Sequence, residues 1–134
     1  MKRLPLMLPL ILLILLSREP TMAEWMPIYE IHQLATTVSI DLDTIRRNGE
    51  LAELWVLYDS KTTQAGRGGL LRSTKAQGEF NCVSWKSRIL AITDFSGNEA
   101  SGKVVYRNSD EQQWEPVKPG TLGFTLWKAA CNKP

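Results

Sequence analysis

Hydrophobic and polar positions alternate along much of the chain with the two-residue period of a β-strand. The clearest case runs from Leu51 to Tyr58, where Glu53 is the only polar position. Even-numbered positions of this segment point to one face of the strand and odd-numbered positions to the other. Because both sets are apolar, the segment is predicted to be a central strand with both faces at least partly covered.

Shorter patterns of the same kind occupy much of the remaining chain. Alternation and β-branched residues predict strands at 25–34, 36–42, 71–83, 84–95 and 103–107, with a short extended piece at 114–117. Asp43 to Gly49 is expected to form a short turn of helix, with Asp43 as N-cap and Gly49 at its exit. The polar, glycine-containing segment 59–69 predicts a mobile hairpin loop.

The last part of the chain has a helical pattern instead. Lys118-Pro119-Gly120 ends the extended pattern, and Thr121 can cap a helix that runs to about Cys131. One face of this helix carries Leu122, Leu126, Ala129 and Ala130, and a neighbouring stripe carries Phe124, Trp127 and Cys131. We therefore predict an α+β domain, with a single antiparallel sheet of about six strands and the C-terminal helix packed on one face.

The N-terminal segment has the pattern of a secretory signal peptide. Two basic residues precede an apolar run from Leu4 to Leu16, and a more polar stretch follows as far as Ala23. The run is shorter than the roughly 20 residues that cross a bilayer as a helix. We expect residues 1–23 to be the signal peptide and residues 24–134 to be one mature domain. An uncleaved membrane anchor is the alternative, whereas a lipid anchor is not expected because no Cys closely follows the run.

Charge limits the classes of partner. The chain has 134 residues and a formal net charge of +2, with 43% hydrophobic and 22% charged residues, which are globular values. The predicted signal peptide contains Lys2, Arg3 and Arg18 but only one acidic residue, Glu19, so the mature chain is close to neutral. A nucleic-acid-binding surface is therefore not expected, and electrostatic recognition would need a local patch.

The two cysteines, Cys82 and Cys131, lie in the predicted mature domain. Export would place them in an oxidising compartment, where a disulfide closing a loop of about 50 residues would stabilise the fold by about 4 kcal/mol. Such a bond would tie the predicted helix to the sheet. Two free or metal-binding thiols are the alternative, although His32 is the only histidine and no C-x-x-C pair is present.

Catalytic motifs are weak in this sequence. No nucleophile elbow of the G-x-S-x-G type accompanies His32, so a hydrolase acting through this residue is the weakest hypothesis. The segment Gly66-Arg67-Gly68-Gly69 lacks the Gly-Lys-Ser/Thr ending of a phosphate loop, and a flexible turn explains it better. The sequence therefore predicts no enzyme, no catalytic residue, no cofactor and no metal site.

Candidate binding residues are a group of cations and one aromatic residue. A small basic patch that would suit an acidic protein or a glycan consists of Arg46, Arg47, Arg67, Arg72 and Lys75. An ordinary solvated turn explains these cations better than a binding patch does. Among the five tryptophans, Trp114 lies beside charged and Gln residues and is expected to be the most exposed. Core packing explains the others as well as an interface would.

An ordered series of segments resembles one known family. The segments are residues 40–49, 54–62, 79–82, 96–97, 102–105 and 114–123. Together they resemble the surface-adhesin protein E-like family of exported Gram-negative bacterial proteins, over nearly the whole mature chain. The resemblance implies a six-stranded antiparallel sheet with a C-terminal helix and a disulfide matching Cys82 and Cys131. It also implies binding of host matrix and plasma proteins by an outer-membrane lipoprotein, whereas this chain has no lipid-accepting Cys.

Two functional hypotheses follow. The first is an exported, non-catalytic binding domain of the bacterial envelope that recognises a protein, with a second copy of the chain as one candidate partner. The second is a soluble periplasmic protein that binds a small ligand or an envelope partner, and a pocket between helix and sheet would favour it. In both cases the chain is expected in the periplasm or at the cell surface, with no membrane span after signal cleavage.

Overall fold

The computed structural model describes residues 24–132, so the predicted signal peptide lies outside the described residues. The strands are β1 (Met26–Ile31), β2 (Thr36–Ile40), β3 (Arg46–Asn48), β4 (Leu51–Ala65), β5 (Leu70–Asn81), β6 (Lys86–Phe95), β7 (Val104–Asn108) and β8 (Glu115–Pro116). The helices are the 3-10 helices η2 (His32–Leu34) and η3 (Leu42–Thr44) and the α-helix α2 (Leu122–Cys131). None of these helices is long and apolar enough to cross a membrane.

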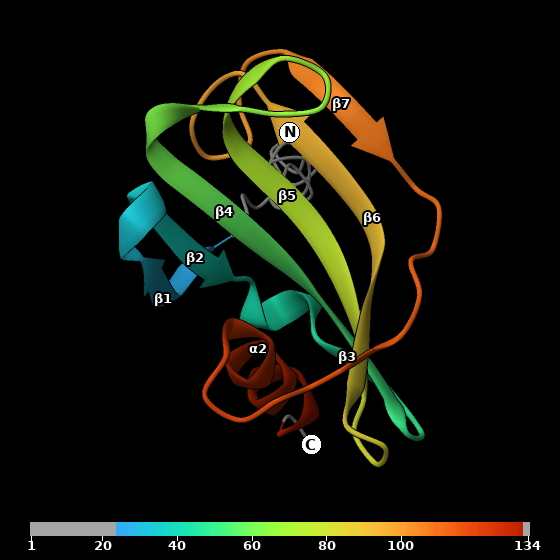
Figure 1. Cartoon of the computed structure of the whole chain (residues 1–134). Coiled ribbons are helices and arrows are strands. Elements are labelled where there is room, and N and C mark those ends of the chain that lie inside the picture. Colours follow the sequence, from blue (N-terminus) through green and yellow to red (C-terminus); the bar gives the residue numbers. More distant parts are fainter. Residues whose placement is uncertain (1–23, 133–134) are drawn as a thin grey trace, which may run out of the picture.

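All eight strands belong to one antiparallel sheet. Their order is β1-β2-β4-β5-β6-β7 (Figure 1). In addition, β3 pairs with β4, and β8 pairs with β6. The prediction of about six strands was therefore too low, and the described fold is mostly β with one α-helix. The small strands β3 and β8 contain three and two residues, which is too few for an alternating pattern to show.

The helical turn predicted at Asp43 to Gly49 is wrong. A 3-10 helix, η3, begins one residue earlier, because the Asp41 carboxylate accepts a hydrogen bond from the Asp43 backbone N–H (3.1 Å). The chain then extends as β3 and pairs with the beginning of β4. Gly49 takes φ = 63° in the turn between the two strands, a conformation that glycine adopts without strain.

The hairpin of β4 and β5 is longer than predicted. The segment 59–69, expected to be a mobile loop, continues β4 as far as Ala65 and leaves a turn of four residues. The backbone N–H of Lys61 donates to the carbonyl of Ala35 (2.9 Å), which fixes the extension from the neighbouring part of the chain. An exposed polar strand has no apolar alternation, so sequence pattern alone does not distinguish it from a loop.

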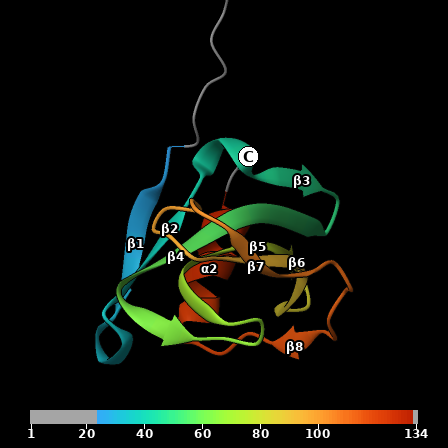
Figure 2. The ribbon, with the colours of Figure 1, turned by 90° about the horizontal axis from the view of Figure 1, so that it is seen from above.

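The core lies between the sheet and α2 (Figures 1 and 2). Even-numbered residues of β4 from Ala52 to Val56 face the helix and are at most 2% exposed, as the alternation predicted. They form one cluster with Leu126 and Ala130 of α2. The position of β4 between β2 and β5 confirms it as a central strand.

The predicted C-terminal helix and the disulfide that joins it to the sheet are confirmed. The Thr121 hydroxyl caps α2 by accepting a hydrogen bond from the Phe124 N–H (3.2 Å). Cys131, the last residue of α2, is bonded to Cys82 directly after β5, with 5.6 Å between their Cα atoms. The disulfide therefore joins the end of the helix to the turn between β5 and β6.

Candidate functional site

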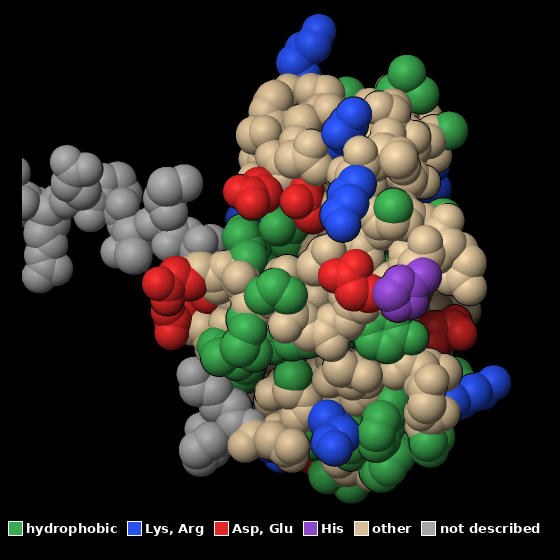
Figure 3. All heavy atoms as spheres, turned by 90° about the vertical axis from the view of Figure 1, so that its left-hand side faces the viewer, with side chains coloured by type: hydrophobic (Ala, Val, Ile, Leu, Met, Phe, Trp, Pro, Cys, Tyr) green, Lys and Arg blue, Asp and Glu red, His purple; other side chains and the backbone are tan. Residues whose placement is uncertain are grey.

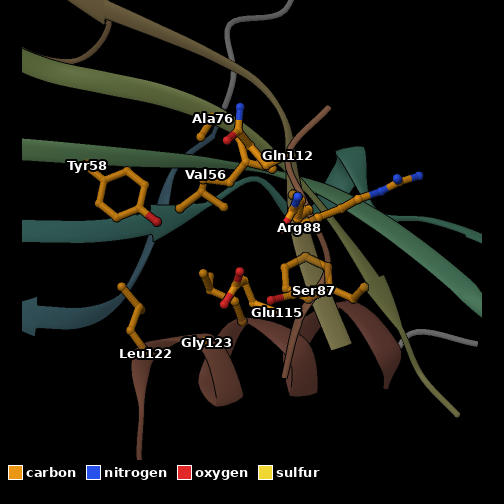
Figure 4. A pocket seen from close by; sticks show the side chains of 14 residues that line it. Val56, Tyr58, Ala76, Ser87, Arg88, Gln112, Glu115, Leu122 and Gly123 are labelled. Carbon is orange, nitrogen blue, oxygen red and sulfur yellow. The ribbon is translucent and has the colours of Figure 1, made fainter. Parts of the chain in front are cut away.

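The helix α2 covers only one end of the concave face of the sheet, and a cavity lies beside it. The cavity has a volume of about 670 Å³ and is bounded by α2, by strands β4 to β6 and by residues 109–121, here called the strap. Figure 4 shows its lining from close by. Its size falls within the range of about 300–1,000 Å³ that small-molecule sites occupy.

Hydrogen bonds hold the strap along the outer edge of β6. The Gln112 N–H donates to the Ile89 carbonyl (2.9 Å), and the Val117 N–H donates to the Trp85 carbonyl (2.9 Å). Between these two points, β8 pairs with the beginning of β6. The strap is therefore a wall of the cavity, and it contributes Gln112 and Glu115 to the lining.

Small residues leave the space that the cavity occupies. Ala76 and Gly78 stand in β5 on the same face as Phe80, and Gly123 lines the cavity from α2. A Cβ atom at Gly78 would lie 3.0 Å from carbon atoms of the Phe80 ring, so a larger residue there would displace the ring. A shift of register between Gln77 and Gly78 adjusts the pairing of β5 with β6 at the same place.

Polar side chains of the lining are Tyr58, Ser87, Arg88, Gln112, Gln113 and Glu115. The Tyr58 and Ser87 side chains lie on opposite sides of the cavity, and their hydroxyls point into it (Figure 4). Neither hydroxyl has a hydrogen-bond partner within residues 24–132. Burial raises the pKa of the Tyr58 phenol, so the group stays protonated and able to donate. The cavity therefore suits a ligand with an apolar body and one or two hydrogen-bonding groups.

The cavity continues along the sheet towards the turn between β4 and β5. Two further hollows, of about 270 Å³ and 350 Å³, follow it, and Ile89 lines all three spaces. Leu34 bounds the second space on the side of β1, and Arg67 bounds the third. The concave face thus carries three adjoining hollows between Leu122 and Arg67, which together we call the groove.

A tyrosine–arginine pair closes the far end of the groove. Nη1 of Arg67 donates to the Tyr106 hydroxyl (3.4 Å), and the guanidinium carbon lies 5.8 Å from the centre of the tyrosine ring. The hydrogen bond from Arg67 lowers the pKa of the Tyr106 phenol. Arg67 therefore holds the β4–β5 turn against β7, which carries Tyr106.

The structure divides the predicted basic patch between two ends of the molecule. Arg46 and Arg47 lie on β3, opposite the beginning of β4. Arg67 lies in the turn that follows the end of β4. With a rise of about 3.3 Å per residue, the two ends of this strand are roughly 40 Å apart. The arginine pair and Arg67 therefore do not belong to one surface.

The remaining residues of the predicted patch have partners of their own. Arg72 Nε donates to the Thr63 hydroxyl (3.2 Å). Lys75 Nζ lies 4.9 Å from the centre of the Trp55 ring, a cation–π contact. These side chains therefore hold β5 to β4 on the sheet surface.

The tryptophan expected to be most exposed is not. Trp114 is half-buried beneath the guanidinium of Arg88, which lies 4.4 Å from the centre of its ring. Trp85 is instead 42% exposed. Sequence reasoning missed it, although Ser84 and Lys86 flank it.

The groove residues were also missed by sequence reasoning. Tyr58 and Ile89 were assigned to predicted strands, without any indication that both line a cavity. The available signal was the pair of small residues Ala76 and Gly78 within an otherwise well-filled strand. Small residues at the centre of a strand mark places where space or close approach is needed.

Among residues 24–132, neither a catalytic arrangement around His32 nor a metal site is found. His32 is exposed in η2, and no hydrogen bond joins its side chain to a described Ser or Asp. No group of three His, Cys, Asp or Glu side chains within residues 24–132 could hold a metal ion. The chemistry that the groove offers is burial of apolar surface together with a few hydrogen bonds.

These features define a small β-sheet protein with a disulfide-tied helix and a groove on the concave face. The family model of Surface-adhesin protein E matches residues 25–132, and the chain belongs to the surface-adhesin protein E family. Membership of an adhesin family implies an exported surface protein with a non-enzymatic role, and it suggests a protein partner.

Solved structures of Haemophilus influenzae protein E have the same fold. The selenomethionine form gives a TM-score of 0.61 at 11% identity, over 86% of this chain and 92% of that chain. Crystal form II gives a TM-score of 0.62 at 11% identity, over 86% of this chain and 94% of that chain. Protein E from non-typeable Haemophilus influenzae gives a TM-score of 0.54 at 12% identity, over 84% of this chain and 79% of that chain. No curated protein matches the chain significantly.

Proposed function

We propose that this chain is a non-catalytic binding protein of the bacterial envelope that recognises a partner protein through the groove. Membership of the adhesin family supports an adhesin-like role. Its resemblance to that family favours host matrix or plasma proteins as the partner class. Residues 1–23 would direct export, and residues 24–134 would form the functional domain. The groove carries this proposal, because it is a large apolar surface that α2 leaves uncovered.

The composition of the groove matches that of a protein-binding surface. Its centre is apolar, with Val56, Ile89 and Leu122. Tyr58 and Arg88 lie in its lining, and tyrosine and arginine are enriched among residues that dominate binding energy. Because the groove runs along the sheet, it suits an extended segment of a partner chain that inserts apolar side chains.

Ser87 is the best position for a test, because its side chain points into the cavity (Figure 4). Ser87→Phe is expected to fill the cavity and abolish binding to purified matrix or plasma proteins in surface plasmon resonance. Thr93→Phe is the matched control, since Thr93 lies on the same strand opposite Lys75, on the other face. Equal binding by both folded variants would contradict recognition through the groove.

A second function is favoured by the enclosed part of the groove. The cavity beside α2 has the size of a small-molecule site, and the unpaired Tyr58 and Ser87 hydroxyls would fix the orientation of a ligand. Native mass spectrometry of protein isolated from its own cells tests this function. A small molecule released on unfolding, and absent from Ser87→Phe, would favour a periplasmic ligand-binding protein. Its absence would leave protein recognition as the supported function.

Location is tested by protease treatment of intact cells, with a periplasmic protein as control. Digestion of this protein while the control is protected would place it on the surface and support the adhesin-like role. Protection until the outer membrane is breached would contradict that role. The search would then turn to periplasmic proteins and small apolar ligands.

A further inference from the structure

The end of the molecule that carries the disulfide has an exposed aromatic surface. Trp85 lies with its ring centre 4.3 Å from that of Trp127 and 5.7 Å from that of Phe124, both on α2. Trp85 is 42% exposed and Val83, in the same turn, is 67% exposed. Figure 3 shows hydrophobic side chains gathered at this lower end, over α2. We call Val83, Trp85, Phe124 and Trp127 the aromatic tip.

Hydrogen bonds and the disulfide hold the turn that presents the aromatic tip. The Asn81 side-chain oxygen accepts a hydrogen bond from the Val83 N–H (3.0 Å), and the Asn81 carbonyl accepts one from the Trp127 indole N–H (2.9 Å). The disulfide adjoins this turn. Trp85 has φ = 57°, which large side chains rarely adopt. A strained residue that is held by these bonds and still exposes a large ring indicates a contact surface.

Five cations lie on segments that adjoin the aromatic tip, and Lys128 Nζ lies 5.7 Å from the centre of the Phe124 ring. They come from β3, the start of β6, the strap and α2, and they are Arg46, Arg47, Lys86, Lys118 and Lys128. All five are exposed, and none has an ion-pair partner within residues 24–132. The strap carries three acidic residues, Asp110, Glu111 and Glu115, and Glu50 follows β3 in the turn to β4. The result is an apolar centre with five cations on the adjoining segments that form no ion pair with the acidic residues nearby.

We propose that this end of the molecule docks on the surface of an anionic lipid bilayer. Tryptophan rings are favoured at the boundary between headgroups and hydrocarbon, and exposed cations are attracted to anionic headgroups. A flat bilayer contacts a projecting turn and cations from four separate segments at the same time. An acidic protein would have to match each of these positions individually. The inference is independent of binding through the groove.

The opposite end of the hairpin supplies a matched control. Lys103 and Arg107 are exposed there, on and beside β7, and that end contains no Trp. Replacing both by Glu changes the net charge by the same amount as Lys86→Glu combined with Lys128→Glu. Any difference between the two double variants therefore reports the position of the charges and not their sum.

Cosedimentation with vesicles tests the proposal on residues 24–134. We expect binding to vesicles of phosphatidylglycerol and phosphatidylcholine in equal parts, and no binding to pure phosphatidylcholine. Raising the salt concentration from about 0.1 M to about 1 M should release the protein, because the screening length falls from about 10 Å to about 3 Å. Lys86→Glu/Lys128→Glu should lower the partition coefficient at least about tenfold, whereas the Lys103→Glu/Arg107→Glu control should bind as the parent does.

Trp85→Asn tests the apolar contribution separately. Asn tolerates the left-handed backbone conformation of this position, so the turn should keep its shape. The variant should remain folded at the assay temperature and bind several-fold more weakly. Absence of vesicle binding by the parent, or equal losses in both double variants, would overturn the proposal. Binding to soluble polyglutamate but not to vesicles would also overturn it and would indicate an acidic protein partner.

Discussion

The two ends of the β4–β5 hairpin are stabilised in different ways. At the end near α2, apolar side chains of β4 such as Leu54 are sealed against Leu126 and Ala130 of the helix, and the disulfide fixes the helix in place. At the end near the β4–β5 turn, hydrogen bonds of Ser, Thr, Asn and Asp side chains stabilise the fold instead. The first end depends on the amount of apolar surface removed from water, and the second depends on specific hydrogen-bond partners.

The polar end joins residues that are far apart in the sequence. The Ser73 hydroxyl donates to the Gly97 carbonyl (2.6 Å) and accepts from the Ala100 N–H (2.9 Å). The Asn98 amide donates to the Ser60 carbonyl (2.7 Å). These bonds fasten the loop between β6 and β7 onto the hairpin. Because each buried polar group needs its own partner, single substitutions here remove specific bonds.

Loss of the disulfide should have the largest effect and should act on the α2 end. Cys82→Ser/Cys131→Ser is expected to lower the free energy of unfolding by about 4 kcal/mol, because a loop spanning 49 residues is no longer closed in the unfolded chain. For a domain of this size the melting temperature should fall by roughly 15–30 °C. Circular dichroism melts measure the change. A melting temperature equal to that of the oxidised parent would contradict the stabilising role of the disulfide.

Truncation of the apolar core should have the next largest effect. Leu54→Ala is expected to cost about 3 kcal/mol, since Leu54 is fully buried and α2 cannot collapse onto the space left behind. Leu70→Ala is the matched control, because Leu70 is 65% exposed and should cost less than about 0.5 kcal/mol. Urea unfolding of both variants gives the comparison. Similar costs for the two would show that burial does not dominate at the α2 end.

The polar end should respond to loss of a single hydroxyl. Ser73→Ala is expected to cost about 2 kcal/mol, because the Gly97 carbonyl and the Ala100 N–H lose their partner in a buried position. Amide exchange should report faster opening of the β6–β7 loop, with α2 unchanged. Ser109→Ala, at an exposed position, is the control and should be neutral. Equal protection of the loop in both variants would count against a polar network at this end.

Two tyrosines should show the smallest effect, as opposite shifts in titration. Burial raises the pKa of Tyr58, and the hydrogen bond from Arg67 lowers that of Tyr106. Tyr106 should therefore ionise at lower pH than Tyr58 in an ultraviolet titration, with Tyr106→Phe and Tyr58→Phe assigning the two steps. Tyr58 contributes stability that is complete below pH of about 10 and is lost as the pH rises through its folded pKa. The reverse order of ionisation would refute the assignment.

The α2 end could be predicted from sequence because its signals are local or periodic. Alternation along Leu51 to Tyr58 identified the central strand, and the spacing from Leu122 to Ala130 identified the helical face. The capping role of Thr121 is a property of neighbouring residues. The Cys82–Cys131 bond was favoured because only two cysteines are available.

The polar end could not be predicted in the same way. The strand extension beyond Asp59 is polar, and its pairing depends on a backbone bond from Lys61 to the distant Ala35. Ser73 and its partner Gly97 are 24 positions apart, so no window of sequence contains both. The groove was also difficult to predict, because small residues such as Gly78 create it and no polar motif marks it.

The disulfide also has a mechanical consequence. When the chain is pulled from its two ends, the bond between Cys82 and Cys131 carries the load, so the 49-residue span between them does not lengthen. Tension can unravel only the part before this loop, from β1 to β5. Reduction of the bond would release roughly 170 Å of additional contour length. One wall of the groove, with Ile89 and Leu122, lies inside the shielded loop, whereas Tyr58 lies outside it. A stretching force would therefore draw the two walls apart before it extended the wall inside the loop.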